Sequence, residues 1–359
     1  MDSRRIVPAA GHRASRLSWA TATVFGSFVL ATMATADDDV LVPREPWSNF
    51  FADAPVELTY DVAAQDARDA TAQWTLAVDE RTVDSRMASV QRDGDAIAKV
   101  AVAFDAPEVR PGIVLGATLT VVLREAGQSA ALASHKRTLW FFPRDPFADR
   151  GDWLAERKIT LFDPSGRTAR HFEESSIPFQ PTKNIDALEN LAEGMIIVGE
   201  GVSARDYRAL GAVLSKAASA GRPVLWLAPA AGQFPFPGTD AADLPQPSRV
   251  TLARQEIILE LDKRLDAASW PSDGKAIASG LLVRGEGRRA TAEAVAGEAG
   301  WPWLEAEYPG GGRLLIASFA LVDHWDHGPA PRYLLLRMLE RLAGEPPAMI
   351  LNNPRRIDP

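Results

Sequence analysis

One apolar run, bounded by Gly221 and Gly232, constrains the fold of this chain more than any other feature. Its centre, Val224 to Leu227, has the length and composition of a buried strand, and it leads into the turn Pro229-Ala230-Ala231. Turns after the strands of an open α/β sheet lie at the edge where such sheets present ligand sites. No Cys or Ser stands in this turn, so the sequence predicts a place for chemistry without the reactive atom.

Strands and helices alternate on the amino-terminal side of this run. Apolar stretches predict strands at Lys158 to Phe162 and at Ile196 to Val198, with Arg167 to Glu174 between them. Ser203 and Asp206 fit a capping box, which predicts a helix over residues 203–220 that stops at Gly221. This order of elements is typical of a parallel sheet covered on both faces.

The pattern continues toward the carboxyl end with two helices and a hairpin. Residues 254–265 place their apolar side chains at helical spacing, and a second helix is predicted from Pro329 to Ala343. Its prolines suit a first helical turn, and Gly344 suits a stop. Between the helices, residues 303–308 and 313–321 are predicted to pair through a glycine-rich turn.

The first half of the chain has a different period. Residues 97–104 alternate small and larger side chains, which places the larger apolar ones on one face, as in one half of an antiparallel sandwich. Pro143 and Pro146 then interrupt the pattern, because two prolines so close together fit neither a central strand nor a helix interior. Five strands are predicted before this break: Val56–Val62, Ala72–Val78, Ala96–Phe104, Val114–Arg124 and Leu132–Phe142.

The amino terminus predicts export. Basic residues precede an apolar run from Trp19 to Met33, which ends in Ala34-Thr35-Ala36. This is the order found in a signal peptide, with cleavage expected after Ala36; the alternative is a segment kept as a membrane anchor. We therefore expect an exported protein, periplasmic or extracellular, with no membrane contact beyond this segment.

Composition excludes several classes of function. The chain has no Cys, so disulfides, thiol catalysis and Cys-ligated metals are all absent. Its formal net charge of -8 at pH 7 argues against nucleic acid and anionic membranes as partners, because both require clustered Lys and Arg.

The densest group of potential ligands is Asp323-His324-Trp325-Asp326-His327, which follows a predicted strand. Imidazole and carboxylate groups can bind a metal, can contact another ligand, or can shape the entry into the following helix. No second cluster of Asp, Glu and His completes a metal site. We therefore predict ligand contacts from Asp323, His324, Trp325 and Asp326, and no metal.

Two further features are candidates for binding. The segment from Gly199 to Ala204 reads G-x-G-x-x-A, but Val224 stands where a dinucleotide site needs an acid, so we predict a tight turn and no cofactor. Trp301 and Trp303 would point to the same side of an extended segment. They form either an aromatic platform for sugar rings or part of the core.

Residues 158–343 resemble the class I glutamine amidotransferase-like domain, a flavodoxin-like α/β fold, in the form appended to exported bacterial glycoside hydrolases. The segments that carry this resemblance are residues 195–201, 221–227 and 311–326. Residues 54–147 are similar to the Ig-like sandwich that often accompanies it. The resemblance implies a Cys in the elbow for active members, and Pro229-Ala230-Ala231 departs from it, so amidotransferase activity is not expected.

The expected architecture is an all-β Ig-like sandwich followed by a three-layer α/β domain. Its main functional hypothesis is an exported, non-catalytic binding or scaffolding module whose partner is a carbohydrate or a glycoside hydrolase. One alternative is an exported hydrolase with a site around Asp323, His324 and Asp326 and an adjoining acidic residue. Another is a structural oligomerisation module with its interface at the Trp301 hairpin. The expected divisions are a signal peptide at 1–36, a linker at 37–54, the sandwich at 55–147, the α/β domain at 148–345 and a tail at 346–359.

Overall fold

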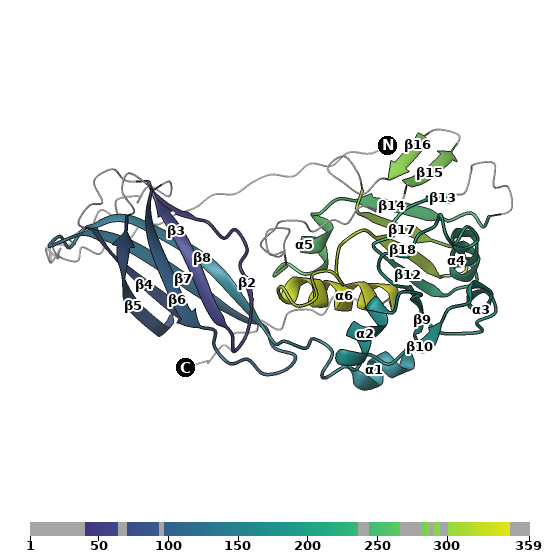
Figure 1. Cartoon of the computed structure of the whole chain (residues 1–359), viewed down its shortest axis with the longest axis horizontal. Coiled ribbons are helices and arrows are strands. Elements are labelled where there is room, and N and C mark those ends of the chain that lie inside the picture. Colours follow the sequence, from purple (N-terminus) through teal and green to yellow (C-terminus); the bar gives the residue numbers. More distant parts are fainter. Residues whose placement is uncertain are drawn as a thin grey trace, which may run out of the picture. The chain divides into compact units, whose positions relative to one another are not determined.

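The structure is a computed structural model that describes residues 40–63, 70–92, 97–235, 244–265, 282–287, 290–294 and 301–344, with the backbone alone for 282–294. It is mostly β-sheet with some helices (Figure 1). The described residues belong to one compact unit of the chain, which begins after Ala36. The predicted signal peptide and the tail 346–359 lie outside the described residues. Within the described ranges, no helix has both the length and the apolar character needed to span a membrane.

The first sheet has eight strands in the order β1-β3-β6-β5-β4-β7-β8-β2. All neighbouring strands are antiparallel except β2 and β8, which run parallel. The strands are β1 (Leu41–Pro43), β2 (Asn49–Phe51), β3 (Pro55–Val62), β4 (Ala70–Val78), β5 (Arg81–Gln91), β6 (Ala98–Asp105), β7 (Leu115–Glu125) and β8 (Ala131–Phe142).

This sheet encloses its own core, because its two halves contribute side chains to a single apolar cluster. Tyr60 and Val102 come from one half, and Trp74, Leu119 and Phe141 come from the other. Strand β6 alternates strictly between buried and exposed side chains, as its sequence predicts. The prediction of a linker over 37–54 is wrong for its described part, since β1 and β2 form there and pair with β3 and β8.

The second sheet has seven strands in the order β10-β9-β11-β12-β18-β17-β14. The first five are parallel, and β17 and β14 close the sheet in antiparallel pairs. The strands are β9 (Thr160–Phe162), β10 (Gln180–Thr182), β11 (Ile196–Val198), β12 (Pro223–Leu227), β14 (Arg249–Ala253), β17 (Trp303–Glu307) and β18 (Arg313–Ala317). A small third sheet holds β13 (Gln233–Pro235), β15 (Leu282–Gly287) and β16 (Ala290–Ala294).

The order of the parallel strands locates a topological switch point. After β9 the chain adds β10 on one side, then crosses to add β11, β12 and β18 in turn on the other side. In chain order the five strands therefore read 2-1-3-4-5, and the direction of winding reverses between β9 and β11. Open sheets of this kind bind ligands at the carboxyl ends of the strands beside such a reversal.

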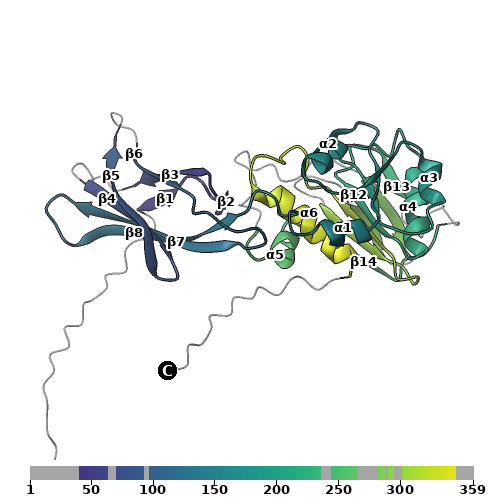
Figure 2. The same cartoon turned by 90° about the horizontal axis from the view of Figure 1, so that it is seen from below.

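Helices cover both faces of the second sheet (Figures 1 and 2). One core packs Ile197 and Leu225 of the strands against α1, α2, α5 and α6, and the other packs Val198 and Trp226 against α3 and α4. Successive strand residues thus alternate between two cores, which explains their continuous apolar character. The helices are α1 (Gly151–Glu156), α2 (Arg167–Glu174), α3 (Ile185–Glu189), α4 (Leu210–Ser219), α5 (Ile257–Leu261) and α6 (Pro329–Leu342).

Two helices differ from the sequence-based expectation. Helix α4 begins at Leu210 rather than near Ser203, and the segment before it bonds both locally, from the nitrogen of Tyr207 to the carbonyl of Ser203, and to the turn after β12. The nitrogen of Arg205 donates to the carbonyl of Ala231, and that of Ala230 donates to the carbonyl of Val202. Helix α5 is five residues long, much shorter than predicted. Helix α6, by contrast, has the predicted start and ends within one residue of the prediction.

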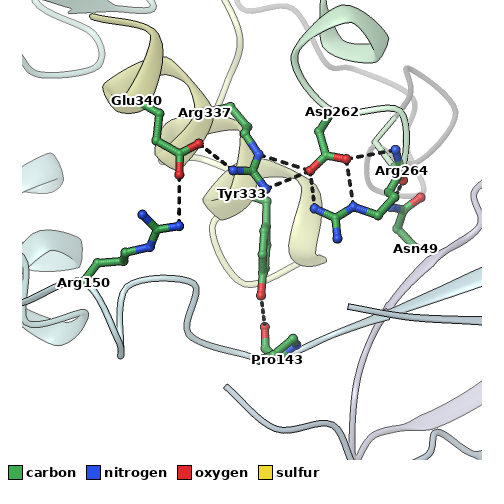
Figure 3. A network of polar contacts seen from close by, with 8 residues as sticks. All are labelled: Asn49, Pro143, Arg150, Asp262, Arg264, Tyr333, Arg337 and Glu340. Carbon is green, nitrogen blue, oxygen red and sulfur yellow. Dashed lines mark hydrogen bonds and ion pairs between the residues drawn. The ribbon is translucent and has the colours of Figure 1, made fainter. Parts of the chain in front are cut away.

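A buried ionic network surrounds α6 (Figure 3). Arg337 donates to Asp262 at 3.1 Å and to Glu340 at 2.5 Å, and Arg264 donates to the same Asp262 at 2.7 Å. The Asn49 amide of β2 donates to the carbonyl of Arg264, and the Tyr333 hydroxyl donates to that of Pro143. The last two bonds join the segment after α5, and α6 itself, to the eight-stranded sheet, since Asn49 belongs to β2 and Pro143 follows β8.

Candidate functional site

The candidate site lies at the carboxyl ends of β9 and β11, where the winding of the sheet reverses. Asp163 follows β9 directly and is 6% exposed. Its carboxylate accepts hydrogen bonds from the nitrogen of Ala169 at 2.9 Å and from the hydroxyl of Ser165 at 2.7 Å. Asp163 thus fixes the start of α2, which supplies the next residues of the site.

Gly199 allows the end of β11 to approach α2 closely. A Cβ atom at this position would lie 2.8 Å from the Thr168 hydroxyl and 3.0 Å from Asp163, closer than van der Waals contact permits. The same hydroxyl of Thr168, fully buried, accepts a hydrogen bond of 2.9 Å from the nitrogen of Glu200. The first glycine of the G-x-G-x-x-A segment is therefore needed for packing.

The rest of that segment does not form a phosphate cradle of the dinucleotide type. Such a cradle ends in a helix whose amino terminus faces the phosphate. Here α4 starts at Leu210, nine residues after Gly201, and the nitrogen of Gly201 already donates to the carbonyl of Ala228.

Glu200 is the central charged group of the site. It is 3% exposed, and its two carboxylate oxygens accept hydrogen bonds from the nitrogens of Val322 at 2.8 Å and Asp323 at 3.1 Å. Burial raises the pKa of Glu200, although the backbone bond from Val322 and the charges of Arg167 and His324 oppose the shift. Glu200 therefore holds the segment after β18 against the end of β11.

Two oppositely charged side chains reach solvent beside Glu200. Arg167, in the first turn of α2, forms an ion pair with Asp323, and the two side chains are 49% and 52% exposed. His324 is half-buried, and its ring lies 5.4 Å from that of the exposed His327. A guanidinium donor, a carboxylate acceptor and an imidazole thus share one edge of the sheet.

The turn after β12 lacks a reactive side chain, as its sequence predicts. Ala228 has a φ of 29°, a strained value for a residue with a Cβ, and it is 2% exposed. Strain of this kind often marks functional positions, such as a nucleophile after a strand. Here the side chain is a methyl group, which cannot attack or transfer a proton.

The remaining residues of the predicted ligand group have structural contacts. Trp325 is 2% exposed and stacks on Phe147, with ring centroids 6.4 Å apart. Asp326 is exposed and pairs with Arg332 of α6. Among the described residues, no group of three or more His, Asp and Glu side chains is arranged to hold a metal. The structure therefore brings Asp323 and His324 to the candidate site and places Trp325 in the core.

Of the two roles that the sequence allows for Trp301 and Trp303, the structure places both indoles against the core. Trp303 is fully buried in the core that contains α6, whereas the half-buried Trp301 packs against the core on the opposite face of the sheet. The two indoles diverge because only Trp303 belongs to β17, so the segment between them is not an extended strand. The two indoles therefore do not form a joint platform for a sugar ring.

Sequence reasoning missed four residues of the site: Asp163, Arg167, Thr168 and Glu200. A position directly after a predicted strand singled out the turn after β12, and the same signal was available for Asp163, which follows the predicted strand at Lys158 to Phe162. Arg167 and Thr168 open the helix after that strand. The partnership of Glu200 with the segment after β18 had no such signal, because it joins residues 122 positions apart.

Comparisons with known proteins add little to this geometry. No family model matches the chain, and no curated protein matches it. One solved structure that it matches is the Paenibacillus sp. cycloisomaltooligosaccharide glucanotransferase complexed with cycloisomaltoheptaose, at 15% identity and a TM-score of 0.23. The match covers 46% of this chain and 21% of that one, so the chain spans about a fifth of the length of this structure. A similarity this slight supports no conclusion about fold or function.

Proposed function

We propose that the chain is an exported, non-catalytic binding module that takes its ligand at the switch point of its α/β sheet. In this proposal an all-β, Ig-like sandwich precedes a flavodoxin-like α/β domain, similar to class I amidotransferase-like domains without their nucleophile. The strand order 2-1-3-4-5 supports the flavodoxin-like assignment. The methyl side chain of Ala228 supports the non-catalytic one.

The observation that carries the proposal is the exposed pair of Arg167 and Asp323 on a fixed support. Asp323 is held by the bond from its nitrogen to Glu200, and Arg167 belongs to a helix whose start is fixed by Asp163. A binding site needs such a rigid support, because ordering flexible side chains on binding reduces affinity.

The chemistry of this pair suits a polyhydroxylated ligand. A guanidinium offers several donors in one plane, and a carboxylate accepts at two oxygens. Sugar hydroxyls donate and accept at once, so neighbouring hydroxyls can bond to both partners. Together with the resemblance of the sequence to domains of exported glycoside hydrolases, this makes an oligosaccharide, free or presented by a glycoside hydrolase, the first ligand class to test.

The test is thermal stabilisation of the purified protein by a panel of neutral oligosaccharides. A ligand that binds only the folded state raises the melting temperature by mass action. We expect a rise with one glycan class that is lost in Arg167→Ala and kept in Arg44→Ala. The control also removes an exposed arginine from an ion pair, since Arg44 pairs with Asp61 on β3. Absence of any shift across the panel would contradict the proposal.

A second candidate is a hydrolase that uses Glu200 as the adjoining acidic residue. The observation that favours it is the raised pKa of Glu200 beside His324, because perturbed carboxylic acids at strand ends are typical of general acids. This candidate requires turnover of model esters or glycosides that is lost in both Glu200→Gln and His324→Ala. Turnover kept in either variant would exclude the site.

The proposal of export has its own test. Expression in an exporting bacterial host, followed by mass measurement of the intact product, is expected to show a chain that begins at Asp37. A product that keeps Trp19 to Met33 would indicate the membrane-anchor alternative instead.

A further inference from the structure

Strand β5 presents a long unpaired edge. It pairs with β4 from Arg81 to Ser89, but with β6 only at Val90 and Gln91. In the parts of the chain that the structure describes, no strand pairs with the other edge of residues 81–89 (Figures 1 and 2). Free N–H and C=O groups along such an edge are a template for pairing with another chain.

The side chains of β5 are also largely uncovered. Met87 is 64% exposed, the largest value among the exposed hydrophobic residues of the described chain, and Val83 is 53% exposed. The register with β4 shifts opposite Val83, so the strand carries a bulge there and is regular from Asp84 onward. The strand therefore combines a free edge with two exposed apolar side chains, Val83 at the bulge and Met87 in the regular part.

We propose that β5 is a dimerisation edge, at which two copies of this chain pair antiparallel about a two-fold axis at Ser85. In antiparallel pairing about this axis, a residue that lies a given number of positions before Ser85 faces the residue that lies the same number of positions after Ser85 in the second copy. Met87 then faces Val83 of the second copy, and Asp84 faces Arg86 of the second copy. Each contact occurs twice, as the symmetry of an isologous interface requires.

The charges of β5 select this register over its neighbours. Moving the axis to Asp84 places the two Asp84 carboxylates directly opposite each other, and moving it to Arg86 does the same to the two guanidiniums. Like charges directly opposite in a cross-strand pair are destabilising, whereas opposite charges contribute favourably. An axis midway between two residues would set the face of one strand that carries Met87 beside the face of the other strand that carries Asp84 and Arg86. The axis at Ser85 therefore gives the best-matched pairing.

The same charges explain why this edge would not attract other strands. Charged side chains on an edge normally protect it against unspecific pairing. Asp84 and Arg86 already form an ion pair of 3.0 Å within one chain, so both lie on the same face of the strand. A foreign strand that sets a like charge opposite Asp84 or Arg86 is disfavoured, whereas a second copy sets an opposite charge at both positions.

The test exploits charge reversal at these two positions. The protein is expressed from its full coding sequence in an exporting host, and its mass in solution is measured by light scattering during size exclusion. We expect a dimer for the natural chain, and dimers weakened by about tenfold or more for Arg86→Asp and for Asp84→Arg, because each reversal creates two like-charge pairs.

Mixing the two variants provides the decisive comparison. Arg86→Asp carries acidic residues at both positions and Asp84→Arg carries basic ones, so together they restore opposite charges at every contact. Equimolar mixing is expected to give heterodimers although each variant alone is monomeric, and an effect on the fold of one chain could not produce this result. A monomeric natural chain, or a dimer that survives either reversal unchanged, would overturn the proposal.

Discussion

A carboxylate oxygen of Glu200 accepts a hydrogen bond of 2.8 Å from the backbone nitrogen of Val322, and its other oxygen accepts one from the next residue. Through this contact the end of β11 holds the segment that carries Asp323 and His324. The buried carboxylate of Glu200 thus fixes the backbone at the position where the proposed ligand binds.

Removing this support is expected to destabilise the fold. Glu200→Ala leaves two backbone N–H groups without their acceptor, and an unsatisfied buried donor costs about 1–3 kcal/mol. The free energy of unfolding from urea titration should fall by that order. Glu193→Ala is the matched control, because Glu193 forms an exposed ion pair with Lys158 and its removal is expected to cost less than about 1 kcal/mol. Equal losses in both variants would contradict the supporting role.

The stability of the protein should depend on pH through Glu200. Burial raises the pKa of this carboxyl in the folded state above its ordinary value of 4.5, so the folded state holds the proton more tightly than the unfolded state. The resulting stabilisation is complete below the unfolded pKa and is lost as pH rises through the folded pKa. Urea titrations from pH 4 upward should show this decline in the natural chain relative to Glu200→Gln, which cannot titrate. An opposite slope of the difference would refute the assignment.

Gly199 should not tolerate a methyl group. The added Cβ in Gly199→Ala would overlap the Thr168 hydroxyl and Asp163, and overpacking of this kind costs about 1–3 kcal/mol. Gly151→Ala serves as the control, since a Cβ there meets nothing within 4 Å at the start of α1. Thermal melting should separate the two variants, and an unchanged melting temperature for Gly199→Ala would argue against the close approach of β11 to α2.

The buried network around α6 depends on Asp262. This carboxylate is 6% exposed; burial alone would raise its pKa, but Arg264 and Arg337 outweigh that effect and keep the pKa below its ordinary value. Asp262→Asn leaves two guanidiniums without their shared counter-charge, which is expected to cost about 3–5 kcal/mol. Asp61→Asn, which breaks the exposed pair with Arg44, is expected to cost about 0–1 kcal/mol. Unfolding titrations of both variants test the difference.

The periodicity of the sequence was enough to place most strands and the last helix. Alternation predicted the buried face of β6, and the prolines and glycine around α6 predicted both of its ends. Strand β5 escaped prediction because most of its side chains are exposed and its inner face carries Asp84 and Arg86, which leaves no apolar alternation to detect. The start of α4 escaped because the segment after Ser203, although it makes the expected local bonds to Ser203, also bonds to the turn after β12, a contact that the local sequence does not encode.

The candidate site could be predicted in location and only partly in composition. Strand ends pointed to the correct edge of the sheet, and Asp323 and His324 lie there. The sequence could not decide between a platform and a core position for Trp303, because α6, which belongs to the same core, follows it in sequence and gives no local signal. The role of Glu200 depends on a contact with residues far along the chain, which periodicity and spacing do not encode.

The central claim is that Arg167 and Asp323 form a binding site on a non-catalytic support. Its most direct test is calorimetric titration of the oligosaccharide that best stabilises the protein into the natural chain, Arg167→Ala and Arg44→Ala. An exposed ion pair adds little stability, so both variants should stay folded. The account predicts saturable binding to the natural chain and to Arg44→Ala, with no glycan consumed, and a loss of about tenfold or more in affinity for Arg167→Ala. Equal affinity in all three proteins, or conversion of the glycan during the titration, would contradict it.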